Sequence, residues 1–337
     1  MAPDRVTLQE VARRAGVSRT TASFVLTGRR DMRISANAEE RVLRAARELN
    51  YRPNLMARGL RTRVSQTIGL VSDTVATEPF AGEIVRGAVS TALLNDRLLF
   101  MGETEGDGEL EKRVVRDMLD RGVDGFLYAA MYTLEAHPPA ALRGHPLVLL
   151  NCLTANPRTP AVVPDEQAAG HAAARTLLEA GHREHIHVVG ETVPHVFASR
   201  ERLAGIGAAL SAERLELAGT IRCMWWPQYA YQAVRQFLAD GARATGLICL
   251  NDRIALGAYQ AIQEAGLRIP DDVSIVSFDD SDLASWLRPQ LTSIAIPHFE
   301  LGRRAVELLL AGERDAGVER IPMPVRRRAS VGPPAAS

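Results

Sequence analysis

Near the start of the chain, apolar residues recur at spacings of three and four, which predicts a short amphipathic helix with its inner face at Leu8, Val11, Ala12 and Ala15. Thr7 and Glu10 have the spacing of a capping box, so this helix begins near Leu8. Gly16 supplies a left-handed residue that ends it. Ser18 then caps a second helix, so a tight turn joins the two helices.

The second helix has a narrow apolar face and a polar outer face. Its inner residues are Ala22, Val25 and Leu26, which leaves an outer face of Arg19, Thr20, Ser23 and Phe24. A DNA major groove admits such a helix, because arginine can donate two hydrogen bonds to guanine and Thr or Phe can touch a thymine methyl group. Two helices joined in this way are typical of a helix-turn-helix. An ordinary small helical bundle is the alternative.

A third helix completes this module, and the module is basic. Its apolar positions are Val42, Ala45, Ala46 and Leu49, and we expect the Asn37 and Glu40 pair to cap it. Residues 1–63 carry 14 Arg against 6 Asp or Glu, although the whole chain has a net charge of zero. The positive end is therefore the expected nucleic-acid end.

From Gln66 onward, short apolar runs alternate with amphipathic patterns. The runs predict strands at 67–71, 98–101, 125–129, 146–150, 186–190, 247–250 and 274–278. The patterns between them predict helices at 84–94, 110–119, 168–180, 231–238 and 254–264. Buried strands that alternate with helices indicate parallel, doubly wound α/β sheets, and there are too many units for one sheet.

Length and composition fit this organisation. The chain has 337 residues, of which 46% are hydrophobic, so it can bury more than one core. No segment has the apolar length of a signal peptide or a membrane span, so we expect a cytoplasmic protein without a membrane partner. Three widely spaced cysteines, Cys152, Cys223 and Cys249, favour reduced thiols over a disulfide framework.

Several motifs taken together resemble the lactose/galactose-repressor (LacI) family of bacterial transcription regulators. They are VSRTTASFVLTGR, LNYRPNLMARGLR, TIGLV, GVDGFLY, EAGHREHIHVVG, NDRIALGA, IPDDVSIVSFDD and LTSIAIP, and they run in order from about Thr7 to about Ala329. The resemblance implies a helix-turn-helix headpiece (1–53), a hinge helix and linker (54–64) and a ligand-binding and dimerisation core (65–337). That core is periplasmic-binding-protein-like, with two Rossmann-like subdomains at about 65–163 with 294–321 and about 164–293 with 322–331.

For DNA, the resemblance and the outer face of the second helix assign separate roles. Arg19, Thr20 and Phe24 are expected to read bases, although the family often has arginine at the position of Phe24. Phosphate contacts are expected from Thr7, Ser18, Thr21 and Ser23. In the short hinge helix, which includes Asn54, Ala57 and Arg58, the resemblance makes Leu60 the wedge that enters the minor groove and kinks the duplex.

For the effector, residues are carried over position by position. Arg202 and Asp279 match the family's effector-binding arginine and aspartate, which can bracket vicinal hydroxyls by charge-assisted hydrogen bonds. The remaining matches are Asn151 and Asn251 as polar contacts and Phe80, Trp225 and Trp286 as stacking aromatics. Ser277 replaces a common glycine. The alternative is that Arg202 and Asp279 form a structural ion pair and that the aromatics belong to the core.

The sequence thus predicts a ligand-responsive regulator, most simply a repressor that binds a pseudo-palindromic operator as a homodimer and is released by a sugar. A corepressor-dependent repressor, answering to a nucleobase or a phosphorylated metabolite, is the second interpretation. A sugar-binding transport protein is a remote third, because it would lack the headpiece. The tail has no heptads, which favours a dimer over a tetramer.

Other motifs carry less weight. His182, His185 and His187 lie close enough in sequence to suggest zinc, but four good ligands are not evident. Gly205 and Gly207 resemble part of a dinucleotide fingerprint, yet they lie inside a helical pattern and not after a strand. No catalytic motif is present either. We therefore expect no enzyme activity, no cofactor and no metal.

Overall fold

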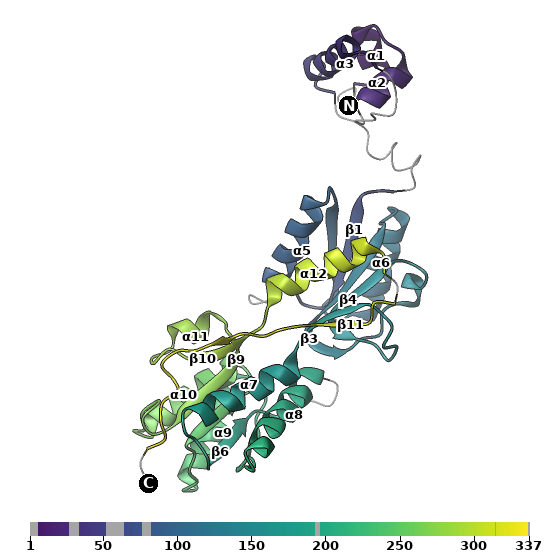
Figure 1. Ribbon diagram of the computed structural model, residues 1–337. Coiled ribbons are helices and arrows are strands. Elements are labelled where there is room, and N and C mark those ends of the chain that lie inside the picture. Colours follow the sequence, from purple (N-terminus) through teal and green to yellow (C-terminus); the bar gives the residue numbers. More distant parts are fainter. Residues whose placement is uncertain are drawn as a thin grey trace. The chain divides into compact units, whose positions relative to one another are not determined.

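The computed structural model describes residues 6–26, 34–51, 64–75, 82–192, 196–313 and 315–335. They belong to two compact units, Met1–Ser65 and Gln66–Ser337, which are treated separately below (Figure 1). The predicted hinge residues Asn54, Ala57, Arg58 and Leu60, together with Phe80, lie outside the described residues.

The first unit contains the three predicted helices, α1 (Leu8–Ala15), α2 (Arg19–Leu26) and α3 (Ala36–Glu48). The capping box is confirmed, because the Thr7 amide donates to Glu10 Oε2 at 2.7 Å and Thr7 Oγ1 accepts from the Glu10 amide at 3.4 Å. Gly16 ends α1 with φ 64°. Val11, Ala22 and Val42, one from each helix, are fully buried in the shared core.

One predicted cap is wrong. Ser35, and not Asn37, caps α3, because Ser35 Oγ accepts from the Ala38 amide at 3.3 Å. Asn37 already lies inside the first turn of the helix, where its side chain is past the capping position.

The second unit contains two six-stranded sheets, which confirm the predicted α/β architecture. The first sheet is parallel throughout and has the strand order β11, β5, β4, β3, β1, β2. These strands are β1 (Thr67–Ser72), β2 (Leu98–Glu103), β3 (Gly125–Glu135), β4 (Leu147–Leu153), β5 (Ala161–Pro164) and β11 (Val318–Ile321).

The second sheet has the order β12, β10, β9, β8, β6, β7 and is parallel except for β12, which runs antiparallel to β10. Its strands are β6 (Ile186–Val189), β7 (Gly219–Ile221), β8 (Gly246–Cys249), β9 (Ser274–Asp279), β10 (Thr292–Ala295) and β12 (Val325–Arg326). All seven predicted strands exist, whereas β5, β7, β10, β11 and β12 were not predicted.

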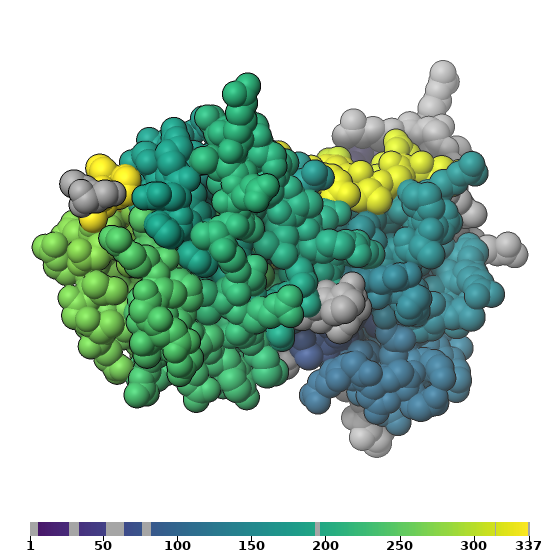
Figure 2. Space-filling model, turned by 90° about the horizontal axis from the view of Figure 1, so that it is seen from below, coloured from purple at the N-terminus to yellow at the C-terminus, as the bar shows by residue number. Residues whose placement is uncertain are grey.

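Helices cover both sheets and define two lobes, which we call lobe 1 and lobe 2. Lobe 1 has α5 (Gly82–Leu94), α6 (Gly108–Asp120), the short η1 (Ala140–Leu142) and α12 (His298–Ala311). Lobe 2 has α7 (Glu166–Glu179), α8 (Phe197–Ala212), α9 (Pro227–Ala239), α10 (Asp252–Glu264) and α11 (Asp282–Trp286). In Figure 2 the lobes are two adjoining masses, lobe 1 in blue with α12 in yellow and lobe 2 in teal and green.

The chain passes between the lobes three times: between β5 and α7, between β10 and α12, and between β11 and β12. The first crossing needs only one residue, Asp165, which also caps α7 by accepting from the Ala168 amide at 3.1 Å. Strand ends of both sheets therefore meet near these crossings. Among the described residues, none forms a helix long and apolar enough to cross a membrane.

Candidate functional site

The outer face of α2 carries the predicted base-reading residues. Arg19 and Thr20 are exposed, whereas Ser23 and Phe24 are half-buried. Ser18 Oγ accepts from the Thr21 amide at 3.0 Å and lies 2.8 Å from Thr21 Oγ1, so these two hydroxyls form the N-terminal cap of α2. A cap of this kind fixes the start of the helix, where Arg19 and Thr20 lie.

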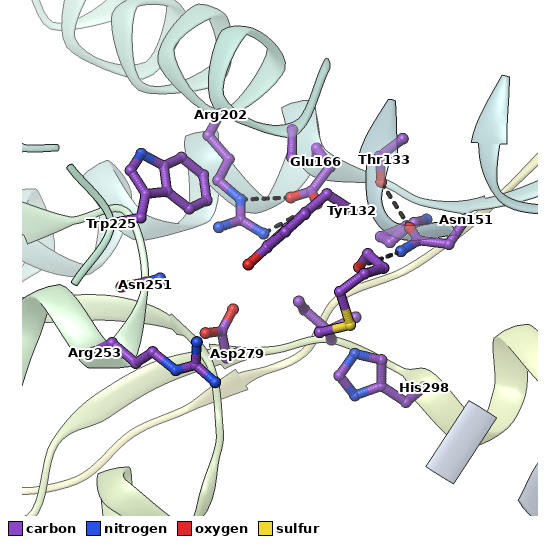
Figure 3. Close-up of a pocket in the computed structure, with 14 residues that line it drawn as sticks. Tyr132, Thr133, Asn151, Glu166, Arg202, Trp225, Asn251, Arg253, Asp279 and His298 are labelled. Atoms are coloured by element: carbon purple, nitrogen blue, oxygen red, sulfur yellow. Dashed lines mark hydrogen bonds and ion pairs between the residues drawn. The ribbon is translucent and has the colours of Figure 1, made fainter. Parts of the chain in front are cut away.

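A cleft lies between the two lobes of the second unit, where strand ends converge (Figure 3). It holds about 580 Å³ of space free of protein atoms, part of it open to solvent. The described residues that line this interlobe cleft are Met131, Tyr132, Thr133, Asn151, Pro164 and His298 of lobe 1, Glu166, Ala198, Arg202, Trp225, Asn251, Arg253 and Asp279 of lobe 2, and Ile296 of the second crossing. Its mix of aromatic and polar groups suits a small molecule.

Arg202, on α8, pairs with a carboxylate other than Asp279, which was its partner in the alternative interpretation. Its Nε and Nη2 donate to the two carboxylate oxygens of Glu166 at 2.6 and 3.0 Å, and its Nη1 donates to the Leu250 carbonyl at 2.5 Å. Both side chains of the pair are only 2% exposed. The structural ion pair of this cleft is therefore Arg202 with Glu166, and not Arg202 with Asp279. Arg202 and Asp279 still face the same space (Figure 3).

Asp279 ends β9 at the floor of the cleft, with a backbone φ of 106°. The pKa of Asp279 is raised to about 8, mainly by burial and then by the nearby Asp252 carboxylate, while Arg202 opposes the shift. Asp252 is fully buried and accepts from the Ser281 amide, Ser281 Oγ and Ser293 Oγ, each at 2.8 Å. The neighbouring carboxyl groups of Asp252 and Asp279 disfavour each other's ionised form.

The two predicted asparagines line the cleft, and both also have structural tasks. Asn251 caps α10, because its Oδ1 accepts from the Ile254 amide at 2.7 Å. Asn151 Nδ2 donates to the carbonyls of Ala130 and Met131 at 3.0 and 2.9 Å, and its Oδ1 accepts from Thr133 Oγ1 at 2.8 Å. Asn151 thereby holds the irregular segment of β3 that projects over the cleft.

Among the described residues that line the cleft, the aromatic side chains are Trp225 and Tyr132, one from each lobe. Their rings meet edge to face with centroids 6.4 Å apart, and Trp225 Nε1 donates to the Glu191 carbonyl at 2.9 Å. Trp225 was predicted. Trp286 is 67% exposed on α11 and is not among the residues that line the cleft, so the structure does not bring it to this site.

Sequence reasoning missed Glu166, Tyr132, Thr133, Arg253 and His298. Glu166 had a usable signal, since it follows an apolar run and starts a helical pattern, where acidic residues usually serve the helix terminus. Tyr132 and Thr133 had none, because they lie in the irregular part of β3 after the predicted strand end. His298 is half-buried, and burial lowers its pKa to about 4, so its ring is neutral.

Two family models match this chain. The model of bacterial regulatory proteins of the lacI family matches residues 7–54, and that of the periplasmic binding protein-like domain matches residues 174–331. The first covers the three helices of the first unit, and the second covers most of lobe 2.

Curated relatives and solved structures match nearly the whole chain. The ribose operon repressor of Haemophilus influenzae is 33% identical over 90% of this chain and 91% of its own length. The HTH-type transcriptional repressor PurR of Aliivibrio fischeri is 31% identical over 93% of this chain and 94% of its own. A crystal structure of the lac repressor dimer bound to operator and the anti-inducer ONPF has a TM-score of 0.81 and 28% identity, covering 98% of this chain and all of that one.

Proposed function

The chain belongs to the lacI family of bacterial regulatory proteins, and on this premise we propose that it represses transcription as an operator-bound homodimer that a small sugar releases. It is a ligand-responsive DNA-binding transcription regulator, and its relatives are repressors. One observation carries the proposal: a capped helix-turn-helix and an interlobe cleft with polar and aromatic walls occur in the same chain.

We assign DNA binding to residues 1–53, the hinge to 54–64 and effector binding with dimerisation to 65–337. Arg19, Thr20 and Phe24 read bases, and Thr7, Ser18, Thr21 and Ser23 contact phosphates. Exposed Arg19 and Thr20 at the start of α2 support this assignment. Such a protein acts in the bacterial cytoplasm, where its operator lies.

A sugar is the effector we favour. Trp225 offers an aromatic face, and Asp279, Asn251 and Arg202 are polar groups of the same cleft. The name of the ribose operon repressor points the same way. A nucleobase corepressor is the second candidate, because repressors named PurR match this chain over a similar length.

An apolar surface on lobe 1 supports the homodimer. Five large hydrophobic side chains at the end of α5 and along the edge strand β2 are exposed: Leu93, Leu94, Leu98, Phe100 and Met101. A cluster of this kind is typical of a protein interface, and an uncovered edge strand invites a partner. A second copy that covers it would bring two headpieces to the two half-sites of a pseudo-palindrome.

Operator release tests the function. The purified protein is titrated against its own upstream DNA at fixed salt, with and without a panel of mono- and disaccharides. We expect one sugar to weaken operator binding, a coupling of about 1–3 kcal/mol. If the protein binds the DNA and no sugar changes the affinity, the effector is not one of these sugars and nucleobases are tested next. If the protein binds the upstream DNA no more tightly than random DNA of equal length, the upstream region does not contain its operator.

The hinge assignment has its own test. Leu60→Ala should weaken operator binding by about 1–3 kcal/mol and leave binding to random DNA nearly unchanged, because a wedge contributes only where the duplex is kinked. Both affinities are measured by fluorescence anisotropy at one salt concentration. Equal losses on both DNAs would exclude the wedge.

A further inference from the structure

Glu166 is a buried carboxylate in the cleft wall that the sequence prediction left without a role. It is the first residue of α7, and close packing of α7 against α8 places it beside Arg202. Gly170 and Gly205 make this approach possible: a Cβ atom at either position would lie 2.0 Å from a carbonyl oxygen of the other helix. The contact is therefore built into the helix pair.

The pairing changes what Arg202 can offer to a ligand. Three of its N–H groups are already used, two on Glu166 and one on the Leu250 carbonyl. A guanidinium has five, so two donors remain. Its positive charge, however, is neutralised by a carboxylate at hydrogen-bond distance. A ligand would meet hydrogen-bond donors without a net positive charge.

The other charged groups of the cleft do not restore a positive balance. Arg253, whose guanidinium lies 4.7 Å from the Trp226 ring centroid, is the second cation among the described lining residues. Asp279 adds no negative charge at neutral pH, because its pKa is raised to about 8. The carboxylate that offsets Arg253 is therefore Asp252, which lies behind the wall and accepts hydrogen bonds from the Ser281 amide, Ser281 Oγ and Ser293 Oγ. His298 adds no charge, since burial lowers its pKa to about 4. An anion would enter a cleft whose field does not attract it.

We propose that Glu166 makes the cleft select an uncharged, hydroxyl-rich effector and reject phosphorylated or carboxylated ones. The proposal rests on the effector role of the cleft proposed above, and it narrows the ligand class. An incoming phosphate that took the same two donors would lie beside the buried Glu166 carboxylate, whose like charge repels it. A phosphate that displaced Glu166 would leave that carboxylate buried without a partner. A neutral sugar can use the two free donors and leave the pair intact. Glu166 thus produces selectivity by making the binding of anionic ligands less favourable.

The decisive probe is inorganic phosphate, because it requires no knowledge of the natural effector. Full-length protein is titrated calorimetrically with phosphate against chloride of equal ionic strength. Glu166→Gln frees the charge of Arg202 and should bind phosphate at least about tenfold more tightly than the unaltered protein. Glu166→Gln combined with Arg202→Gln should lose that gain. Arginines of the headpiece contribute equally in every variant and cancel in the comparison.

Glu213→Gln is the matched control. It removes a carboxylate from another ion pair, between Arg175 of α7 and the residue directly after α8, in which Glu213 Oε1 lies 3.0 Å from Arg175 Nη1. That pair is 41% exposed on both sides and does not line the cleft. Glu213→Gln should therefore bind phosphate like the unaltered protein.

Equal phosphate affinity in Glu166→Gln and the unaltered protein would overturn the proposal, and so would a gain that survives in the double variant. If Glu166→Gln does not fold, phosphate binding to the unaltered protein is compared with phosphate binding to Arg202→Gln. Phosphate binding by the unaltered protein that Arg202→Gln abolishes would overturn the proposal. No phosphate binding by the unaltered protein would support it. Matched pairs, D-ribose with D-ribose 5-phosphate and D-glucose with D-glucose 6-phosphate, add a direct comparison, and a tighter phosphorylated member would also overturn it. Failure of every sugar to release the operator would count against the sugar effector, whereas the phosphate comparison would stand.

Discussion

At the residue scale, Asp279 and Asp252 are two carboxyl groups that the fold buries at the cleft, although water solvates their ionised forms better. Asp252 has three hydrogen bonds from Ser281 and Ser293, and burial still raises its pKa. Asp279 lies in the cleft wall, and its pKa is raised to about 8. A sugar hydroxyl that donates to Asp279 would favour its ionised form, so ligand binding at this residue is linked to proton release.

Asp279 predicts a pH dependence of stability. Its folded pKa of about 8 lies above the ordinary value of 3.8, so between these values the folded state holds a proton that the unfolded state has lost. The contribution of Asp279 to the free energy of unfolding is fully present below about pH 4. It falls as the pH rises toward 8, by up to about 1.4 kcal/mol per pH unit. Asp279→Asn removes the titration, so the variant should gain stability relative to the unaltered protein from pH 5 to pH 8.

Urea unfolding of both proteins at pH 5, 6.5, 8 and 9 measures this difference. Asp272→Asn is a suitable control, because Asp272 lies on the exposed loop before β9, where Arg268 contacts it. A difference between Asp279→Asn and the unaltered protein that stays constant over this range would contradict the raised pKa.

At the element scale, the α7–α8 pair determines the geometry of the site. Gly205 lies on α8 against the Gln167 carbonyl of α7, whereas Gly207, two residues later on the same helix, has no atom within 4 Å of its virtual Cβ position. The same residue type therefore has two different roles within one turn. The partial dinucleotide pattern formed by these glycines is accounted for by helix packing.

Gly205→Ala should force α7 and α8 apart, because its Cβ would lie 2.0 Å from a backbone oxygen. We expect a loss of about 1–3 kcal/mol in stability and weaker effector binding, since Glu166 and Arg202 lie on the two helices. Gly207→Ala is the control and should gain up to about 1 kcal/mol, because alanine favours a helix more than glycine does. Urea unfolding followed by circular dichroism measures both. Equal effects of the two substitutions would refute the close-approach argument.

At the scale of the whole molecule, the proposed dimer would link assembly to DNA binding through the surface of α5 and β2. Leu94 is 85% exposed there, the highest exposure among the large hydrophobic side chains that the structure describes. An isolated lobe would leave this surface in water, whereas a dimer would bury it.

Leu94→Glu should place two like charges in the dimer interface and shift the protein toward monomer. Operator binding should then weaken by tenfold or more, because a monomer engages one half-site. Sedimentation velocity measures the assembly, and anisotropy on full-site and half-site DNA measures the affinity. Val318→Glu, on the opposite edge strand β11, should leave both unchanged. If Leu94→Glu dimerises with the same affinity as the unaltered protein, the dimer interface lies elsewhere.

What the sequence by itself determined was local. The capping box of Thr7 and Glu10, the left-handed Gly16 and all seven predicted strands depend on neighbouring residues and on hydrophobic period, so the sequence alone predicted them. Short strands such as β7 and β12 could not, because they exist only by pairing with distant strands. The carried-over residues Arg202, Trp225, Asn251 and Asp279 all line one cleft.

Only the tertiary structure decided which charges meet. Arg202 lies 36 residues from Glu166 and 77 from Asp279, and nothing in the sequence chooses between these two carboxylates. The choice is made by two glycines that let α7 and α8 approach, and by the crossing after β5 that starts α7 at the cleft. Ion pairing depends on distance and desolvation, and both are properties of the packed chain, which is why the partner of Arg202 became evident only in the fold.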